Sequence, residues 1–127
     1  MHDIQRARGI VDVVLAAAER EGAERIDSID LSVGALTFLS PDQLGFWVRE
    51  MLKGTIGEGA QVVIETLPAR LRCAECGFEG EAAIEDDPIY HFTTLTPGCP
   101  ECGAAQVEII GGRECVVESL RATRRTD

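Results

Sequence analysis

Two C-x-x-C-G motifs constrain this chain more than any other feature: Cys73–Gly77 and Cys99–Gly103. Two residues between the cysteines let a tight turn aim both sulfurs at one ion. The following glycine can take a positive φ, so that backbone N–H groups point at the thiolates. Two such turns supply the tetrahedral sulfur shell that zinc prefers. We therefore expect a structural zinc ion, in a closed shell without room for activated water, held by Cys73, Cys76, Cys99 and Cys102.

A redox C-x-x-C is the alternative for either motif alone, but the pairing of the two motifs argues against it. The start of the chain does not resemble a signal peptide, and no apolar run approaches membrane-spanning length. We therefore expect a cytoplasmic protein, in which paired cysteines favour a metal over disulfides. The fifth cysteine, Cys115, lies in a strand-like run and is expected to be a small buried apolar residue.

The periodicity of apolar residues predicts a body with helices and strands. Residues 4–21 have the three/four spacing of an amphipathic helix, with Gly22 placed to end it. Residues 28–33 alternate between polar and apolar as a half-buried strand does, ending at Gly34. Residues 60–67 predict another strand, which Pro68 ends.

A second helix is predicted from its start signals. Ser40 is a candidate N-cap, Pro41 suits the first helical position, and Gln43 completes an S-x-x-Q capping box. Gly54 is placed to stop this helix. The expected fold is α+β: a small mixed α/β body with two helices packed on a short β-sheet, plus an inserted zinc-ribbon-like module. The predicted domains are an α/β body of residues 1–69 and 106–127 and a zinc-binding module of residues 70–105.

The charge of the chain argues against nucleic acid as a partner. The 127 residues include 22 acidic and 12 basic side chains, giving a net charge of −10. Neutralising phosphates needs a dense Lys/Arg face, which this composition does not provide. The one basic cluster, Arg121, Arg124 and Arg125, is expected to be a solvated tail.

One of the two histidines is residue 2, directly after Met1. The terminal amine, the deprotonated His2 amide nitrogen and the imidazole Nδ1 can close adjacent chelate rings on one metal ion. Such planar nitrogen donors suit Ni²⁺ or Cu²⁺. The fourth position could be the Asp3 amide, the Asp3 carboxylate or a group from elsewhere. The alternative is an accidental early histidine on a disordered terminus. The helix predicted to start at Ile4 argues against it, because that helix would tether the terminus to the body.

Further short motifs stand in order along the whole chain. They are Met1-His2 followed by an acid, Val33–Leu36, Pro41–Leu44, Lys53–Thr55, Glu58–Ala60, the two cysteine motifs and Ile109–Glu114. In this order and spacing the chain resembles the HypA family of nickel metallochaperones, which assist maturation of NiFe hydrogenases and, in some bacteria, urease. The resemblance implies a non-catalytic carrier that binds Ni(II) reversibly and passes it on.

The resemblance also implies the site residues and the partners. Nickel would bind to the terminal amine of Met1, to His2 and to the acidic residue at position 3; zinc would bind to the four cysteines. Most family members have Glu at position 3, whereas this chain has Asp3, whose carboxylate reaches one methylene less far. The implied partners are a nickel-handling GTPase, the hydrogenase large-subunit precursor and, where urease is the client, urease accessory proteins.

His91 lies between the cysteine motifs and has two interpretations. It could shield the zinc module, or it could join the nickel site when a partner docks. Three other classes of protein compete with the carrier. A zinc ribbon that binds nucleic acid explains the cysteines but not the acidic charge. An enzyme lacks a nucleophile or base partner for either histidine, and a nickel-sensing regulator lacks a recognisable DNA-reading element.

Overall fold

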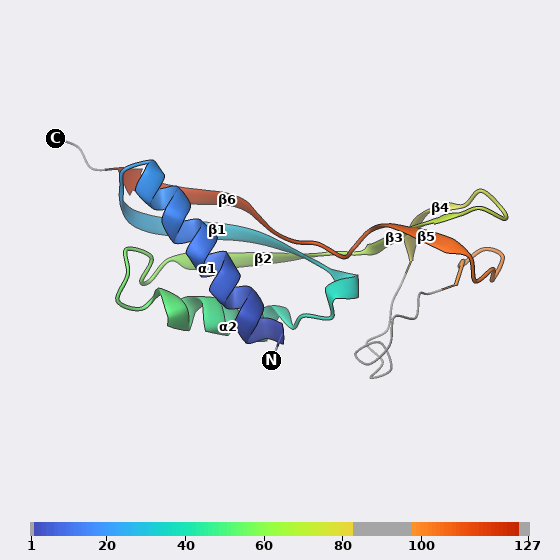
Figure 1. The fold of residues 1–127 in the computed structure, drawn as a ribbon, viewed down its shortest axis with the longest axis horizontal. Helices are drawn as coiled ribbons and strands as arrows, with labels where there is room; N and C mark the ends of the chain where they lie inside the picture. The colour runs from blue at the N-terminus through green and yellow to red at the C-terminus, as the bar shows by residue number, and fades with distance from the viewer. Residues whose placement is uncertain (1, 83–97, 125–127) are drawn as a thin grey trace. The chain divides into compact units, whose positions relative to one another are not determined.

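The computed structural model describes residues 2–82 and 98–124 of the chain (Figure 1). The helices and strands in these ranges follow one another as α1 His2–Arg20, β1 Ala23–Gly34, the 3₁₀ turn η1 Ala35–Thr37, α2 Pro41–Leu52, β2 Gln61–Leu67, β3 Ala69–Cys73, β4 Glu79–Ala82, β5 Val107–Gly111 and β6 Cys115–Arg124. The structure confirms the predicted fold class, with two helices, two small sheets and a four-cysteine cluster. None of the helices in the described ranges is long and apolar enough to cross a membrane.

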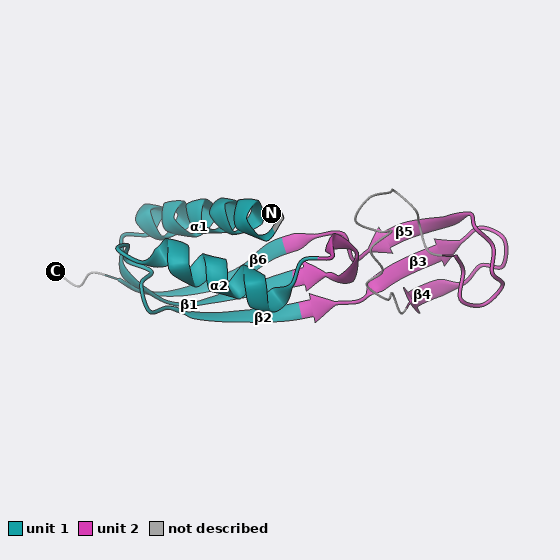
Figure 2. Cartoon of the chain, turned by 90° about the horizontal axis from the view of Figure 1, so that it is seen from below, with its two compact units in different colours: residues 1–32, 39–65, 116–127 teal, residues 33–38, 66–115 magenta. Residues whose placement is uncertain are grey.

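The chain divides into two compact units, coloured separately in Figure 2. Unit 1 comprises residues 1–32, 39–65 and 116–127, and unit 2 comprises residues 33–38 and 66–115. Residues 33–38 thus belong to the same unit as the cysteine motifs, although they include the last two residues of β1. The domain boundaries expected at residues 69/70 and 105/106 stay a prediction.

Unit 1 is built on the three-stranded sheet β2-β1-β6. Both helices lie on one face of this sheet (Figure 2) and pack against each other. The predicted stripe of α1 is largely correct, since Ala7, Val11, Val14 and Ala18 are buried. Two members of the stripe are not buried: Ile4, near the start of the helix, is 37% exposed, and Leu15 is half-buried. Strand β1 is longer than expected and supplies the buried side chains Ile26, Ile29, Leu31 and Val33.

Polar side chains connect β1 to β6. Ser32 Oγ donates to Glu118 Oε1 (2.7 Å), and Ser119 Oγ donates to Asp30 Oδ2 (2.6 Å). Arg124 in β6 pairs with Glu21 Oε2 at 2.7 Å. Arg121 and Arg124 are exposed, as expected of a solvated cluster, but they lie in a sheet strand rather than in a tail; Arg125 lies outside the described residues.

Unit 2 contains the three-stranded sheet β4-β3-β5, in which β3 pairs antiparallel with both neighbours. Leu71 of β3 lies opposite Gly80 of β4 and Ile109 of β5, and it is fully buried. Sequence analysis missed β3 as a strand. Its Ala-Arg-Leu-Arg-Cys run has buried apolar residues alternating with exposed arginines, but the preceding Pro68 suggested an end to β structure.

Two glycines let separate chain segments cross closely within unit 2. Gly34 N–H donates to Glu114 O (2.7 Å), and Leu36 N–H donates to Gly112 O (2.8 Å). A β-carbon at Gly34 would collide with the backbone of Gly112, and one at Gly112 would lie 2.8 Å from Ala69 Cα. Gly112 also has a φ of 104°, which side chains disfavour. These backbone contacts hold residues 33–38 in unit 2.

Candidate metal centres

The first cysteine motif begins where β3 ends. Cys73 is the last residue of that strand, and its N–H donates to Phe78 O (2.8 Å) as the chain returns towards β4. Gly77 closes the turn by donating its N–H to Cys73 O (3.0 Å), with a φ of 78°. The glycine after the second cysteine is thus needed for its left-handed backbone, as the motif predicts.

The second motif repeats this geometry. Cys99 N–H donates to Ala104 O (2.9 Å), and Gly103 N–H donates to Cys99 O (2.9 Å) with a φ of 76°. In addition, the N–H of Glu101 points at Cys99 Sγ, 3.4 Å away. This N–H···S contact stabilises the thiolate that a metal needs.

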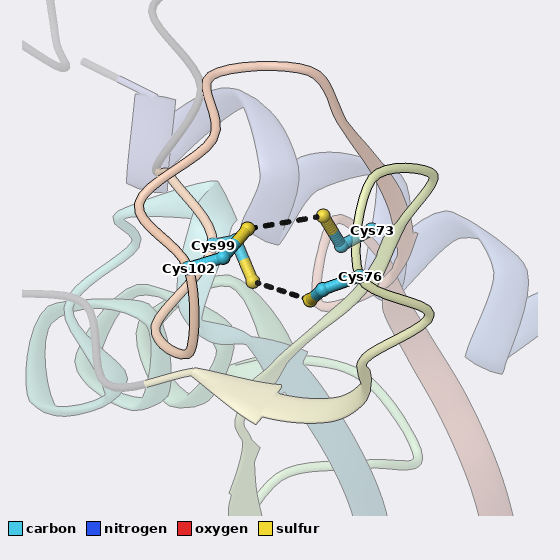
Figure 3. A group of neighbouring side chains, drawn as sticks. All are labelled: Cys73, Cys76, Cys99 and Cys102. Carbon is cyan, nitrogen blue, oxygen red and sulfur yellow. Dashed lines mark hydrogen bonds between the residues drawn. The ribbon is translucent and has the colours of Figure 1, made fainter.

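The two turns bring all four sulfur atoms together, each within 4.8 Å of the others (Figure 3). The cross-motif pairs Cys73–Cys102 and Cys76–Cys99 have Sγ–Sγ separations of 3.7 and 3.6 Å. A tetrahedral ion with metal–sulfur bonds of about 2.3 Å, the zinc value, requires about 3.8 Å between sulfurs. Cys73 and Cys99 are buried and their partners exposed, so the site lies at the surface of unit 2. The arrangement can hold one metal ion in a four-sulfur shell.

The four thiols do not share the same acidity. Desolvation disfavours the Cys99 thiolate, but N–H groups of Cys102 and Glu101 outweigh it and lower the pKa of Cys99 to about 7. The N–H of Phe78 favours the Cys76 thiolate, but desolvation and the neighbouring thiols raise the pKa of Cys76 to about 12. A metal ion must therefore displace protons to obtain four thiolates, which makes its binding weaker in acid.

Cys115 lies apart from the four-cysteine cluster, at the start of β6. It is partly exposed rather than buried as expected. Strand β6 begins in unit 2 with Cys115 and continues in unit 1 from Val116.

The second candidate centre is the start of α1. The helix begins at His2, two residues earlier than predicted. Asp3 lies in its first turn, and its Oδ1 accepts the backbone N–H of Ser40 at 3.1 Å. Ser40 is the N-cap of α2, as predicted, because its Oγ accepts the N–H of Gln43 at 3.3 Å. Met1 and His91 lie outside the described residues, so their predicted roles stay predictions.

Sequence analysis missed the role of the Ser40 N–H. The S-x-x-Q pattern assigns that donor to the side chain of Gln43, three residues after Ser40. The structure gives it to Asp3, 37 positions away. A local capping motif contains no signal for such a long-range partner.

Fold and site together define a class, a small α+β protein that carries a four-cysteine metal site. The family model described as "Hydrogenase/urease nickel incorporation, metallochaperone, hypA" matches residues 1–122. The hydrogenase maturation factor HypA of Methanothermobacter thermautotrophicus is 35% identical over 125 residues, covering 98% of this chain and 99% of the relative. The corresponding factor of Methanopyrus kandleri is 37% identical over 131 residues, covering 95% and 92%. The chain therefore belongs to the HypA family of nickel metallochaperones.

A solved structure supports the fold. The solution structure of the Ni metallochaperone HypA from Helicobacter pylori aligns with a TM-score of 0.66 and 14% identity, covering 97% of this chain and 98% of that one. A likeness at this identity concerns the arrangement of helices and strands. The resemblance that the motif order indicates is thus confirmed by both sequence and fold.

Proposed function

We propose that this chain is a nickel carrier without catalytic activity of its own. It binds Ni(II) at its N-terminus through the Met1 amine, the His2 nitrogens and the backbone amide of Asp3, and delivers the ion during NiFe hydrogenase maturation. The supporting observation is that α1 begins at His2. The first four N–H groups of a helix have no intrahelical acceptor. The His2 amide can therefore lose its proton to nickel without breaking a helical hydrogen bond.

The position of the proposed nickel site suits a carrier that must release its cargo. A helix N-terminus bears a partial positive charge, which opposes a bound cation. The deprotonated amide and the Asp3 carboxylate supply negative charge against it. Protons compete for the amine, the amide and the imidazole, so acid favours release. These opposing charges predict a site weaker than a closed thiolate shell.

The four-cysteine site has a different task in this proposal: it holds Zn(II) permanently through Cys73, Cys76, Cys99 and Cys102. The sulfur separations of 3.6 and 3.7 Å are close to those of a tetrahedral zinc site. A shell of four thiolates leaves no position for water or substrate, so this zinc would be structural. Around it we propose a zinc-binding module of residues 70–105 inserted into a nickel-binding domain of residues 1–69 and 106–127.

The partners follow from membership of the family. The relatives are named hydrogenase maturation factors, and the family description includes urease. We propose a nickel-handling GTPase and the hydrogenase large-subunit precursor as partners in the cytoplasm, with urease accessory proteins where urease is the client. We also propose that His91 joins the nickel site only when the GTPase docks.

A nickel titration of the zinc-loaded protein with a native N-terminus tests the proposal. Wild type should bind one nickel ion, and His2→Ala should bind none while its zinc content is unchanged. His91→Ala is the matched control, because it removes the chain's other imidazole. It should bind nickel like wild type when alone and more weakly in the presence of the GTPase. Equal binding by wild type and His2→Ala would overturn the proposed site, and equal affinity of His91→Ala and wild type in both settings would remove His91 from it.

A further inference from the structure

The side chain of Asp3 connects the first turn of α1 to the start of α2. This side chain is half-buried, and its Oδ1 lies 3.1 Å from the backbone nitrogen of Ser40. Ser40 in turn caps α2 with its Oγ, which accepts the N–H of Gln43. In a capping box the residue three positions into the helix binds the N–H of the N-cap. Here Asp3 of the other helix takes over that function.

Charge and packing both favour this contact. The carboxylate lies in the first turn of α1 and accepts an N–H at the start of α2, and the N-termini of both helices favour negative charge. A hydrogen bond to an ionised acceptor is also stronger than one between neutral groups. Apolar packing anchors the two helices elsewhere, since Val14 of α1 and Val48 of α2 are fully buried. Ile4 beside Asp3 is 37% exposed and anchors the terminal turn weakly.

We infer that Asp3 is a positioning residue of the nickel site, whose carboxylate pins the first turn of α1 to the N-cap of α2. This inference rests on the proposed function, because the pinned turn contains the His2 amide, a proposed nickel ligand. Pinning holds this nitrogen in one arrangement before nickel arrives, which lowers the entropic cost of binding. Nickel bound through Oδ1 would have to break the bond to Ser40, so we assign this oxygen to the hydrogen bond rather than to the metal.

A double-mutant cycle separates positioning from coordination. Ser40→Ala removes only the capping hydroxyl, whereas Ser40→Pro also removes the N–H that Asp3 accepts. Ser40 has a φ of −82°, close to the angle that proline requires. Relative to Ser40→Ala, Ser40→Pro should weaken nickel binding about tenfold. Asp3→Ala should weaken nickel binding by a similar factor, and the double variant Asp3→Ala/Ser40→Pro should lose no more than either single variant.

If the carboxylate instead coordinates nickel, Ser40→Pro will bind nickel like Ser40→Ala, and only the Asp3 variants will be weak. That result overturns the inference but leaves the proposed function intact. By contrast, equal nickel binding by wild type and His2→Ala would overturn the proposed function itself. Zinc content and thermal unfolding of every variant show whether the protein is folded.

The absorption spectrum of bound nickel gives a readout that a structural defect would not imitate. A positioning role predicts that Asp3→Ala binds nickel more weakly but with the ligand-field bands of wild type. Asp3→Asn should recover part of the affinity, because its amide oxygen still accepts the Ser40 N–H. Shifted bands in Asp3→Ala would mean that the carboxylate is a ligand and would contradict the inference. This comparison stands even if Ser40→Pro does not fold.

Discussion

At Gly34 a β-carbon would collide with the carbonyl carbon and oxygen of Gly112, which are backbone atoms. No side chain can rotate to relieve this collision. We predict that Gly34→Ala lowers the free energy of unfolding by about 3 kcal/mol, the upper end of the usual cost of overpacking, because rigid backbone atoms cannot move aside. Unit 2 should be affected first, because residues 33–38 are bound there to Gly112 and Glu114.

Gly9 provides the matched control for this substitution. It lies within α1, and a β-carbon there would have nothing within 4 Å. Gly9→Ala should therefore stabilise the protein by up to about 1 kcal/mol through helix propensity. Urea unfolding of both variants measures the difference. A Gly34→Ala variant as stable as wild type would contradict the close crossing described for unit 2.

The lowered pKa of Asp27 predicts how the free energy of unfolding depends on pH. The hydrogen bonds from Arg25 and Thr123 hold the pKa of Asp27 below its usual value of 3.8. A carboxyl whose pKa is lower in the folded state stabilises the fold above its unfolded pKa and loses this contribution as pH falls through the folded one. Asp27→Asn should thus destabilise the protein at pH 7 and have little effect below about pH 3. The side chains are exposed, so the difference is expected to be small.

Thr123→Val tests the same contact from β6. It removes the hydroxyl that donates to Asp27 Oδ2 at 2.8 Å and leaves the Arg25–Asp27 contact of 2.8 Å in place. Its effect at pH 7 should have the same sign as that of Asp27→Asn but be smaller. Thermal unfolding across this pH range provides the measurement. An Asp27→Asn penalty that persists undiminished in acid would show that the stabilisation does not come from the carboxylate charge.

At the scale of helices and strands, local patterns predicted what local physics determines. The amphipathic spacing located α1, and the Ser40-Pro41 start signal located α2 to the residue. The spacing of the cysteines and the glycine after each pair predicted both turns and the grouping of four sulfurs. Each of these features depends on residues close in sequence or on a motif with a fixed geometry.

Features that depend on distant contacts were not predictable in this way. The five residues of β3 do alternate between apolar and charged, but this short pattern follows Pro68, and only the pairing with β4 and β5 makes the strand evident. Similarly, residues 33–38 belong to unit 2 through the hydrogen bonds Gly34–Glu114 and Leu36–Gly112, which span 80 and 76 positions. The Asp3–Ser40 bond is of the same kind. Long-range pairing of this sort needs the folded structure.

The elements of unit 2 should depend on the metal. Strands β3, β4 and β5 are short; the first cysteine turn continues directly from β3, and the second precedes β5. A small sheet of this size has too little core to fold without support. We predict that removing zinc with a chelator exposes the amides of β3–β5 to hydrogen exchange while α1 and α2 keep their helical circular dichroism.

Cysteine variants provide the control for the chelation experiment. Cys99→Ser removes one proposed ligand and should abolish stoichiometric zinc, with the same loss of protection in β3–β5. Cys115→Ser changes a cysteine outside the cluster and should retain about one zinc ion per chain. If Cys99→Ser retained tightly bound zinc and protected strands, the four-cysteine site would not be structural.

At the scale of the whole molecule, the proposed function gives two metals two sites of opposite character. In this proposal, four thiolates in unit 2 would hold zinc in a closed shell that does not exchange. A terminal amine, an amide and one imidazole at the start of α1 would hold nickel weakly enough to surrender it. The acidic charge of −10 agrees with a carrier of cations and disfavours a nucleic-acid ligand. Delivery would then depend on a partner that binds where α1 begins.

The central claim is that nickel binding needs the native N-terminus and is independent of the zinc site. The most direct test loads two forms of the protein with both metals, one with a native terminus and one extended by a few residues before Met1. Dialysed to equilibrium against the same concentration of free nickel, the native form should contain one zinc and one nickel ion per chain. The extended form should contain one zinc ion and no nickel. Equal nickel content in the two forms would contradict the account.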